Sequence, residues 1–230
     1  MYIHGGGYVL KSALDTTAVL MAHQLQLLVY SIEYRLGPEH PFPAGLNDCM
    51  AVYKSLENRL KSRKVVVFGG SAGGGLALAM LLQAKRNGLP MPKTLGLFSP
   101  WSDLSRTGDS YYANEGRDPV LKWKDNLKFF AAAYAGNANR SNPLLSPIYG
   151  EYEEFPPTII TTGTRDLFLS KCVRLSRRMR LAGVDVELRV WEAMFHGFDL
   201  MPDMPEGREV RREMATFLIQ AGKAMSEATQ

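Results

Sequence analysis

Cysteine is scarce in this 230-residue sequence, which contains only Cys49 and Cys172. Two cysteines cannot form the network of cross-links on which small secreted domains depend, and neither lies in a CxxC or Cys/His metal-binding pattern. A disulfide scaffold and a cysteine-based metal site are therefore excluded. This cysteine usage is typical of a protein that works in the reducing cytoplasm.

Long apolar runs and clustered charge of one sign are also missing. The longest apolar runs, such as residues 76–82, are far shorter than the roughly 18 residues that a membrane-spanning helix needs. No basic segment followed by an apolar core opens the sequence as given, so it predicts no signal peptide. The 27 Lys and Arg residues are interspersed with 23 Asp and Glu residues. The densest basic stretch, residues 174–180, is typical of a solvated helix face, and we expect no nucleic-acid partner.

Short apolar runs alternate with helix-like segments along most of the chain. Runs of this length and character are typical of strands buried on both faces. Their alternation with helices predicts an α/β fold, a mostly parallel sheet with helices on both faces, in a single domain over residues 1–230. The expected strands are 27–34, 64–68, 94–98, 158–162 and 184–191, and the expected helices are 13–26 (capped by Ser12), 44–61, 71–87, 169–182 and 206–226.

One long excursion, residues 102–157, interrupts this alternation. It contains a helix-like piece at 122–134 and a return rich in Pro, Asn and Ser at 142–147. Connections of this length in a compact domain usually carry function. We expect the excursion to form a partial lid or a binding wall.

The turn at residues 69–74 reads GGSAGG and lies between an expected strand and an expected helix. It satisfies the G-x-S-x-G pattern in the strand, turn and helix context that this pattern requires. Small neighbours let the chain turn sharply around Ser71 and project its hydroxyl. The start of the helix beneath it favours developing negative charge. The pattern therefore indicates that Ser71 is a nucleophile.

A glycine-rich turn between a strand and a helix can instead cradle a phosphate. Here the lysine of a Walker loop is absent, and residues 69–74 offer no clean dinucleotide fingerprint with a fitting acidic residue. The nucleophile interpretation is therefore favoured over phosphate binding.

A serine hydroxyl needs a neighbouring base, which is itself oriented by an acid. Of the four histidines, His4 precedes a glycine run, His23 lies within an expected helix, and His40 lies in a Pro-rich turn. His196 follows the last expected strand, where a loop at the carboxyl edge of the sheet would reach Ser71. A loop histidine alone is usually a surface residue, but the chain order Ser, acid, His favours His196 as the base.

The acid should follow the preceding strand. Asp166 lies there, just after the strand at 158–162. It could instead cap the helix expected from about residue 169. Asp185 and Asp199 are rival acids, but the first lies in or beside a strand and the second is very close to His196 in sequence. We therefore favour Asp166.

Residues 4–8 read HGGGY, and three successive glycines are costly in conformational freedom. Acyl transfer passes through a tetrahedral oxyanion that fixed backbone N–H groups stabilise. Glycines let the main chain approach a substrate closely, so the amides of Gly5 and Gly6, together with that of Ala72 after the nucleophile, are expected to form an oxyanion hole. A simple tight turn is the alternative, but it would rarely need three glycines.

The sequence at this point resembles the hormone-sensitive-lipase branch of the α/β-hydrolases, bacterial family IV carboxylesterases above all. The resemblance extends in order over nearly the whole chain. It rests on five segments, YIHGGGY at 2–8, YRLGPEHPFPA at 34–44, GGSAGG at 69–74, SPWSD at 99–103 and VWEAMFHGF at 190–198.

This resemblance implies an α/β-hydrolase fold, esterase activity on small-molecule esters with short acyl chains, no cofactor and no metal. It also implies that Ser71, Asp166 and His196 form the catalytic triad. In the family, the segment around Tyr34, Arg35 and residues 39–41 buttresses the active site, so His40 is expected to have a structural role.

The sequence departs from the family at its start and at Gly37, where the family usually has alanine. Relatives carry tens of residues before the glycine loop, which form cap helices, two leading strands and most of the strand entering the loop. Only residues 1–3 of that strand are present here, so the neighbour between the strands at 27–34 and 64–68 should be nearly missing. A naturally minimal enzyme, a gene start placed too far downstream, and an incomplete chain that needs a homo-oligomer all remain open, with a slight preference for a truncated chain.

Without cap helices, we expect an open, shallow site that accepts acetyl to about hexanoyl esters. The candidate apolar wall consists of Tyr8, Leu167, Phe168, Phe195 and Phe198. An inactive or weakly active truncated hydrolase fold that binds a small molecule is the alternative function. Since all three triad residues are present, esterase activity is favoured.

Overall fold

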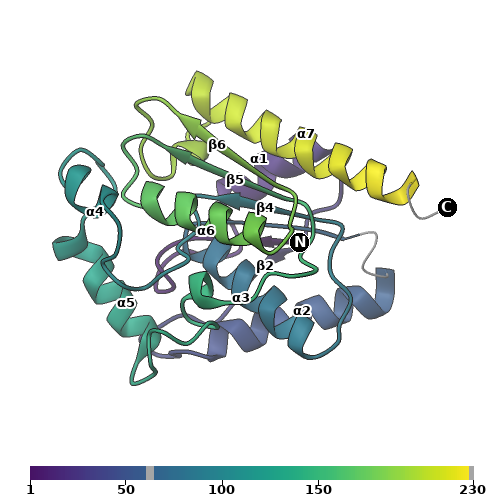
Figure 1. Cartoon of the computed structure of the whole chain (residues 1–230), viewed down its shortest axis with the longest axis horizontal. Helices are drawn as coiled ribbons and strands as arrows, with labels where there is room; N and C mark the ends of the chain where they lie inside the picture. Colours follow the sequence, from purple (N-terminus) through teal and green to yellow (C-terminus); the bar gives the residue numbers. More distant parts are fainter. Residues whose placement is uncertain (61–64, 228–230) are drawn as a thin grey trace.

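A computed structural model of the protein describes residues 1–60 and 65–227, with side chains described as far as residue 221. Within these ranges the strands form one parallel sheet in the order β2-β1-β3-β4-β5-β6. The predicted α/β-hydrolase architecture, a parallel sheet with helices on both faces, is confirmed (Figure 1).

The strands are short and most of the helices are long. The strands are β1 (Tyr2–Ile3), β2 (Ser31–Ile32), β3 (Val66–Gly70), β4 (Thr94–Phe98), β5 (Thr158–Gly163) and β6 (Val186–Trp191). The helices are α1 (Thr16–Leu25), α2 (Ala44–Leu60), α3 (Ala72–Arg86), α4 (Ser110–Ala113), α5 (Lys128–Ala135), α6 (Leu169–Leu181) and α7 (Pro205–Glu227).

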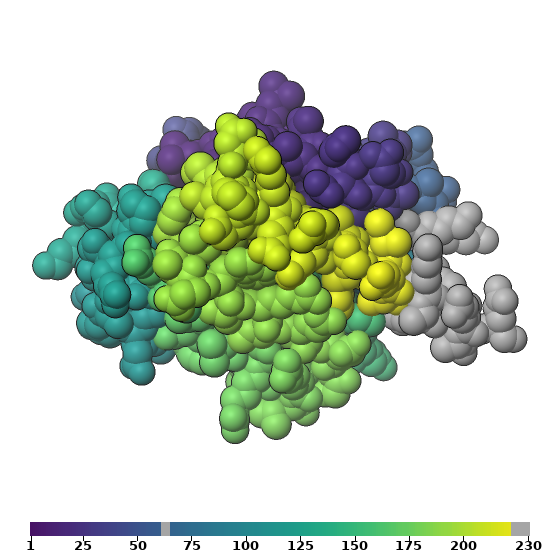
Figure 2. Space-filling view, turned by 90° about the horizontal axis from the view of Figure 1, so that it is seen from above, coloured from purple at the N-terminus to yellow at the C-terminus, as the bar shows by residue number. Residues whose placement is uncertain are grey.

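The helices divide into two layers that bury the two faces of the sheet. Helices α1 and α7 pack together on one face, and α2, α3 and α6 cover the other (Figure 1). The space-filling view shows the yellow α7 running alongside the purple N-terminal part of the chain (Figure 2). Helix α7 packs closely on β4, where a Cβ on Gly96 would lie 2.4 Å from the sulfur of Met214.

Helix α1 begins later than the sequence predicted, and Asp15 caps it instead of Ser12. The Asp15 carboxylate accepts a hydrogen bond from Thr17 N–H at 2.9 Å. The Ser12 hydroxyl accepts a bond from Leu14 N–H, outside the helix. A carboxylate satisfies one of the free N–H groups of the first turn, which explains its place at this position.

The strand predicted over 27–34 is much shorter in the structure. Strand β1 lies between β2 and β3, as expected, and it pairs through Tyr2 and Ile3 alone. Strand β2 can therefore pair only over Ser31 and Ile32. The side chains of Leu27 and Leu28 are exposed. The last residue of the helix predicted over 44–61 and the first residue of the strand predicted over 64–68 lie outside the described residues.

The excursion at 102–157 lies at one end of the molecule, where α4 and α5 appear in teal (Figures 1 and 2). The helix predicted at 122–134 is present as a π-helical turn over Trp123–Leu127 that continues into α5. A short 3₁₀ turn at Pro147–Tyr149 begins the return to the sheet.

Candidate active site

Ser71 lies in the turn between β3 and α3 with φ of 54° and ψ of −120°, a conformation that non-glycine residues rarely adopt. Hydrogen bonds fix this turn, because Ser71 N–H donates to the carbonyl of Phe98 and Trp101 N–H donates to the carbonyl of Ser71, each at 2.8 Å. The Ser71 hydroxyl does not cap α3. It lies 2.9 Å from His196 Nε2.

Close packing of backbone against backbone explains the glycines around Ser71. A Cβ on Gly69 would lie 2.6 Å from the Gly73 carbonyl oxygen, and one on Gly73 would lie 2.0 Å from the carbonyl oxygen of Ile3. The end of β1 therefore presses directly on the first turn of α3. This contact brings the glycine loop that follows β1 next to Ser71.

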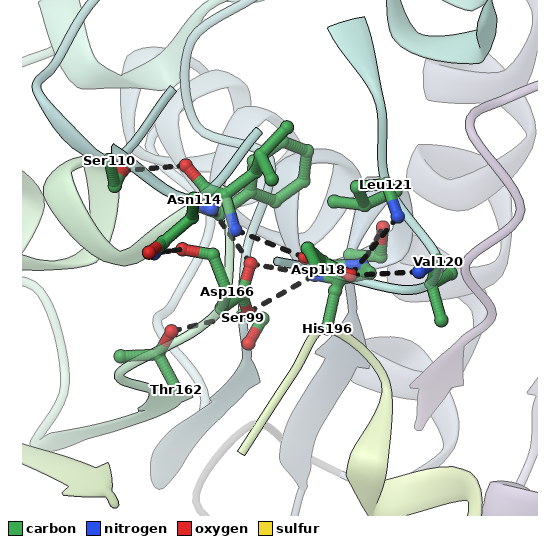
Figure 3. Close-up of polar contacts among 12 residues, drawn as sticks. Ser99, Ser110, Asn114, Asp118, Val120, Leu121, Thr162, Asp166 and His196 are labelled. Carbon is green, nitrogen blue, oxygen red and sulfur yellow. Dashed lines mark hydrogen bonds and ion pairs between the residues drawn. The ribbon is translucent and has the colours of Figure 1, made fainter. Parts of the chain in front are cut away.

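Asp166 and His196 come from the turns that follow β5 and β6. His196 Nδ1 lies 3.2 Å from each carboxylate oxygen of Asp166. The carboxylate also accepts hydrogen bonds from Phe168 N–H at 2.7 Å and from the Thr162 hydroxyl at 3.2 Å. Figure 3 shows Asp166 between His196 and Thr162. The three candidate triad residues thus meet at the carboxyl edge of the sheet.

The rival acids occupy other positions. Asp185 is exposed beside β6. Asp199 is buried one turn beyond His196, but the His196 ring nitrogens bond to Asp166 and Ser71. Phe168, not Asp166, is the residue that immediately precedes α6. The Asp166 carboxylate thus orders the turn before α6 and contacts the histidine at the same time.

Burial and charge act in opposite directions on the pKa values of the His196–Asp166 pair. Burial alone would lower the pKa of His196, but the Asp166 carboxylate beside it, together with Asp118 and Asp199, raises that pKa above its ordinary value. Burial would raise the pKa of Asp166, but its attraction to His196 and its hydrogen bonds lower it. Asp166 is therefore ionised at neutral pH and stabilises the imidazolium form of His196.

The glycine loop lies against the serine turn. Gly5 and Gly6 line the same cavity as Ser71 and His196. Gly6 has φ of 96°, and a Cβ there would lie 2.2 Å from the carbonyl oxygen of Leu10, so no other residue fits without a shift. Ala72 is the first residue of α3, where an N–H has no partner within the helix. The structure thus brings together the three predicted amide donors and the hydroxyl.

Tyr34 supports this loop from behind. Its hydroxyl donates to the His4 carbonyl at 2.8 Å, and its ring stacks on the His4 ring at 4.2 Å between centroids. Gly37 N–H donates to the carbonyl of Tyr8 at 2.9 Å. His40 is exposed. The segment from Tyr34 therefore contacts the back of the glycine loop, and its exposed histidine does not line the cavity that holds Ser71.

Sequence reasoning missed Asp118, a buried carboxylate in the excursion. One of its oxygens accepts hydrogen bonds from Val120 N–H at 2.9 Å and Leu121 N–H at 3.1 Å, and the other accepts from Leu167 N–H at 3.1 Å. Asp118 thus joins the excursion to the turn that carries Asp166, as Figure 3 shows. The Asp-Pro dipeptide indicates the local turn, because Asp favours bonds to amides two and three residues on. No local pattern indicates the bond to Leu167.

Two further side chains attach the excursion to the same turn. Asn114 donates from Nδ2 to the carbonyls of Thr164 at 3.0 Å and Asp166 at 2.9 Å. The Ser110 hydroxyl donates to the carbonyl of Leu167 at 2.7 Å. The turn beneath the candidate acid is therefore held by the excursion as well as by β5.

A cavity of about 360 Å³ opens over Ser71 and His196. Its lining is mostly apolar, with a few polar groups. Besides the glycines, Ser71 and His196, the lining side chains include Leu10, Lys11, Trp101, Val120, Leu121, Leu127, Phe130, Asp199, Leu200 and Met201.

The predicted apolar wall is wrong in its residues. Tyr8, Leu167, Phe168 and Phe198 are buried and, like the half-buried Phe195, do not line this cavity. The Tyr8 ring stacks on Tyr134 and the Phe198 ring packs against Trp191, both in the core. The Phe168 ring supports His196 edge-on at 4.8 Å. Residues next to functional turns fold back into the core here, and the excursion supplies much of the wall.

Within the described residues, no group of three or more His, Cys, Asp or Glu side chains is arranged to hold a metal ion. Among the helices of residues 1–60 and 65–227, none combines the length and apolarity that crossing a membrane requires.

Comparison with known proteins shows the family. A family model described as the alpha/beta hydrolase fold matches residues 1–200. The chain belongs to this family. It is 32% identical to an acetyl-hydrolase of Streptomyces hygroscopicus over 95% of this chain and 74% of that protein, and 29% identical to an esterase of Acinetobacter venetianus over 94% and 73%.

Comparison with solved structures identifies the branch of the family to which the chain belongs. The chain is 35% identical to a hormone-sensitive lipase from a metagenome library, with a TM-score of 0.90 over 94% of this chain and 76% of that one. It is 32% identical to EstE5, solved after soaking with p-nitrophenyl butyrate, with a TM-score of 0.93 over 97% and 76%. The predicted membership of the hormone-sensitive-lipase branch is confirmed, and the chain is a hydrolase.

Proposed function

We propose that the chain is a serine carboxylesterase that hydrolyses short-chain acyl esters, with Ser71 as nucleophile, His196 as base and Asp166 as the orienting acid. The observation that carries this proposal is the 2.9 Å separation of Ser71 Oγ from His196 Nε2, with Asp166 on the other ring nitrogen. The esterase relatives favour this function over the inactive binding module.

In the first half of the reaction, His196 Nε2 takes the Ser71 proton as the hydroxyl oxygen attacks the ester carbonyl. The Asp166 carboxylate stabilises the imidazolium that forms. Collapse of the tetrahedral intermediate breaks the bond to the alcohol oxygen, and His196 returns the proton to that oxygen. In the second half, His196 activates a water molecule that hydrolyses the acyl-enzyme in the same way.

Backbone amides are the groups that stabilise the negative charge on the tetrahedral oxygen. Gly5, Gly6 and Ala72 offer N–H groups around Ser71, and their positions are fixed by the packing of β1 against α3. Fixed donors need no reorganisation as the charge develops, and losing one such donor costs about 10²–10³ in turnover in other hydrolases.

Short acyl chains fit the size and lining of the cavity. A volume of about 360 Å³ with Val120, Leu121, Leu127 and Phe130 in its wall suits a small apolar group. These four residues belong to the excursion at 102–157, which acts as the partial lid of a single domain. Two of the similar proteins agree with small acyl groups, since one is an acetyl-hydrolase and the other was soaked with p-nitrophenyl butyrate.

Initial rates on p-nitrophenyl esters from acetate to dodecanoate test the chain-length proposal. We expect kcat/KM to be highest between acetyl and about hexanoyl. Leu121→Ala, which enlarges the wall, should move the preference towards longer chains, whereas Leu144→Ala in the same excursion but outside the cavity should not. A wild-type preference for dodecanoate would overturn the short-chain proposal.

We also propose a cytoplasmic location. Cys49 and Cys172 are both free and buried, and burial raises the pKa of each thiol, which fits a reducing compartment. Fractionation of the source cells tests the location. A homo-oligomer stays a prediction, which light scattering on the purified protein would test.

A further inference from the structure

Asp199 is a buried carboxylate in the wall of the active-site cavity. It lies in a short 3₁₀ turn, Phe198–Leu200, that starts two residues after His196. The residue is only 5% exposed, yet it lines the cavity with Leu200 and Met201. The proposed triad does not use it, because Asp166 holds the His196 ring.

The nearby cations are engaged elsewhere. The Lys11 ammonium pairs with Asp15 at 2.9 Å, and Arg211 donates from Nη1 to the main-chain carbonyls of Asp199 and Met201. Within the described part of the chain, no side chain donates a hydrogen bond to the Asp199 carboxylate or forms an ion pair with it, and its one bond comes from its own N–H. The carboxylate therefore has free acceptor capacity inside a cavity.

Four titratable residues lie around Asp199. His196 and Lys11 attract its negative charge, Asp15 repels it, and the buried Arg211 lies behind its main chain. The Tyr2 hydroxyl donates its hydrogen bond to Asp15 and is therefore not a partner of the Asp199 carboxylate. Burial outweighs these attractions and raises the pKa of Asp199 to about 6, so the group is mostly ionised at neutral pH.

The proposed mechanism requires the leaving group to lie beside His196. His196 returns its proton to the alcohol oxygen, so that oxygen must lie beside Nε2 when the ester bond breaks. Asp199 follows His196 by one short turn and lines the same cavity. An alcohol held beside Nε2 can reach the wall that carries Asp199, and the apolar side chains of the excursion suit the acyl part.

We propose that the Asp199 carboxylate accepts a hydrogen bond from the alcohol part of the substrate, so that the preferred substrates are esters of short alcohols that carry a hydroxyl or a protonated amine. This inference rests on the proposed esterase function. An apolar alcohol would shield the carboxylate from water without offering it a hydrogen bond. This uncompensated desolvation disfavours esters of apolar alcohols.

Isosteric ester pairs test this directly. In the first pair, 3-hydroxypropyl butyrate differs from butyl butyrate by a hydroxyl in place of a methyl. In the second pair, 2-(dimethylamino)ethyl butyrate differs from 3-methylbutyl butyrate by an ammonium in place of a CH group, because its amine is protonated at neutral pH. Release of butyric acid is followed by pH-stat. A hydrogen bond to a charged group predicts that kcat/KM favours the donor-bearing ester by about tenfold to a hundredfold in each pair.

Substitutions at Asp199 test whether its carboxylate, and not the rest of the cavity wall, causes the two preferences. Asp199→Leu should reduce both preferences to near unity. Asp199→Asn keeps an acceptor but loses the charge, so it should retain most of the hydroxyl preference and lose the ammonium preference. Asp203→Asn, an exposed aspartate in the loop before α7, is the matched control and should leave both ratios unchanged.

If Asp199→Leu does not fold, the kcat/KM ratios of the wild-type enzyme and their pH dependence test the role of Asp199. The ammonium preference should fall as pH drops through about 6, where Asp199 takes up a proton. The titration of His196 cancels in the ratio because both esters use the same base. Equal rates within each pair, or preferences that survive in Asp199→Leu, overturn the role of Asp199.

Failure of the esterase function gives a different result. In that case none of the four butyrates is hydrolysed and a phosphonate ester does not label Ser71. Labelling of Ser71 together with hydrolysis of butyl butyrate but no donor preference rejects the Asp199 inference alone.

Discussion

The turns at the carboxyl ends of the strands and the excursion at 102–157 build the site in different ways. Ser71, Asp166 and His196 each lie within a few residues of a strand end, so the ladder of the parallel sheet places their backbones. The excursion has no strand in the sheet. It is attached through side chains, above all Asp118 and Asn114, that bond to main-chain groups of the turn after β5.

This difference separates two kinds of effect. Changing a residue at a strand end should remove a chemical function and leave the cavity in place. Changing a residue that attaches the excursion should alter pH dependence and stability with a smaller effect on rate.

The largest effect is expected for Ser71→Ala. Removing the nucleophile should lower kcat on p-nitrophenyl butyrate by about 10⁶ and leave the circular dichroism spectrum unchanged. Ser141→Ala, at an exposed position in the excursion, is the matched control and should keep full activity. Retention of most activity by Ser71→Ala would remove this residue from the mechanism.

Asp166→Asn should have the next largest effect, a fall of about 10⁴ in kcat, because the neutral amide no longer stabilises the imidazolium or fixes its tautomer. The pKa of His196 should also fall, since the Asp166 carboxylate raises it in the native protein. Stopped-flow and steady-state rates measure the loss. Asp185→Asn, at the exposed rival acid, should behave as the wild type, and equal losses in the two variants would reject Asp166 as the acid.

Gly6→Ala should lower kcat by about 10²–10³, the range expected for a displaced oxyanion donor. The added methyl would lie 2.2 Å from the Leu10 carbonyl oxygen, so the loop must move. Gly88→Ala is the matched control, because Gly88 also has positive φ but its Cβ would meet nothing within 4 Å. If both variants lose stability but Gly6→Ala keeps its turnover, the loop is only a structural turn.

Asp118→Asn should have the smallest effect on rate and the clearest effect on pH dependence. Asp118 raises the pKa of His196, so removing its charge lowers that pKa. Because the base acts in its neutral form, the acidic limb of the kcat/KM profile should move to lower pH. The amide also loses part of its acceptor capacity, so stability should fall by about 1–3 kcal/mol.

Asp125→Asn, an exposed aspartate in the same excursion, should change neither the pH profile nor the melting temperature. An unchanged acidic limb in Asp118→Asn would show that the excursion does not act on the histidine. A loss of rate as large as that of Asp166→Asn would abolish the distinction between the two regions.

The same distinction explains what the sequence could predict. The parallel sheet follows from the alternation of strands and helices, and the meeting of residues 71, 166 and 196 follows from parallel pairing, since strand ends share one edge. Strand β2 was predicted too long because Leu27 and Leu28 look like strand residues, although β1 offers only two residues for pairing. The Ser12 cap was wrong because Asp15, which also contacts Tyr2, competes for the same role.

The cavity wall could not be predicted because it depends on tertiary packing. Phe168 and Phe198 are adjacent in sequence to functional turns, but their rings pack into the core against Trp101 and Trp191. The wall instead includes residues such as Phe130, far from the triad in sequence, whose ring contacts the position that a Gly7 side chain would occupy. Asp118 was missed for the same reason, since its bond to Leu167 spans 49 residues.

The central claim is that the Ser71 hydroxyl, activated by His196, forms an acyl-enzyme. Mixing the enzyme with excess p-nitrophenyl acetate and quenching at low pH within the first turnover tests it most directly. We predict a burst of nitrophenol close to one equivalent per chain and a 42-dalton acetyl adduct on the peptide that contains Ser71, both absent in Ser71→Ala. An adduct on another residue, or full hydrolytic activity with labelling absent from Ser71 under every quench condition, would contradict the claim.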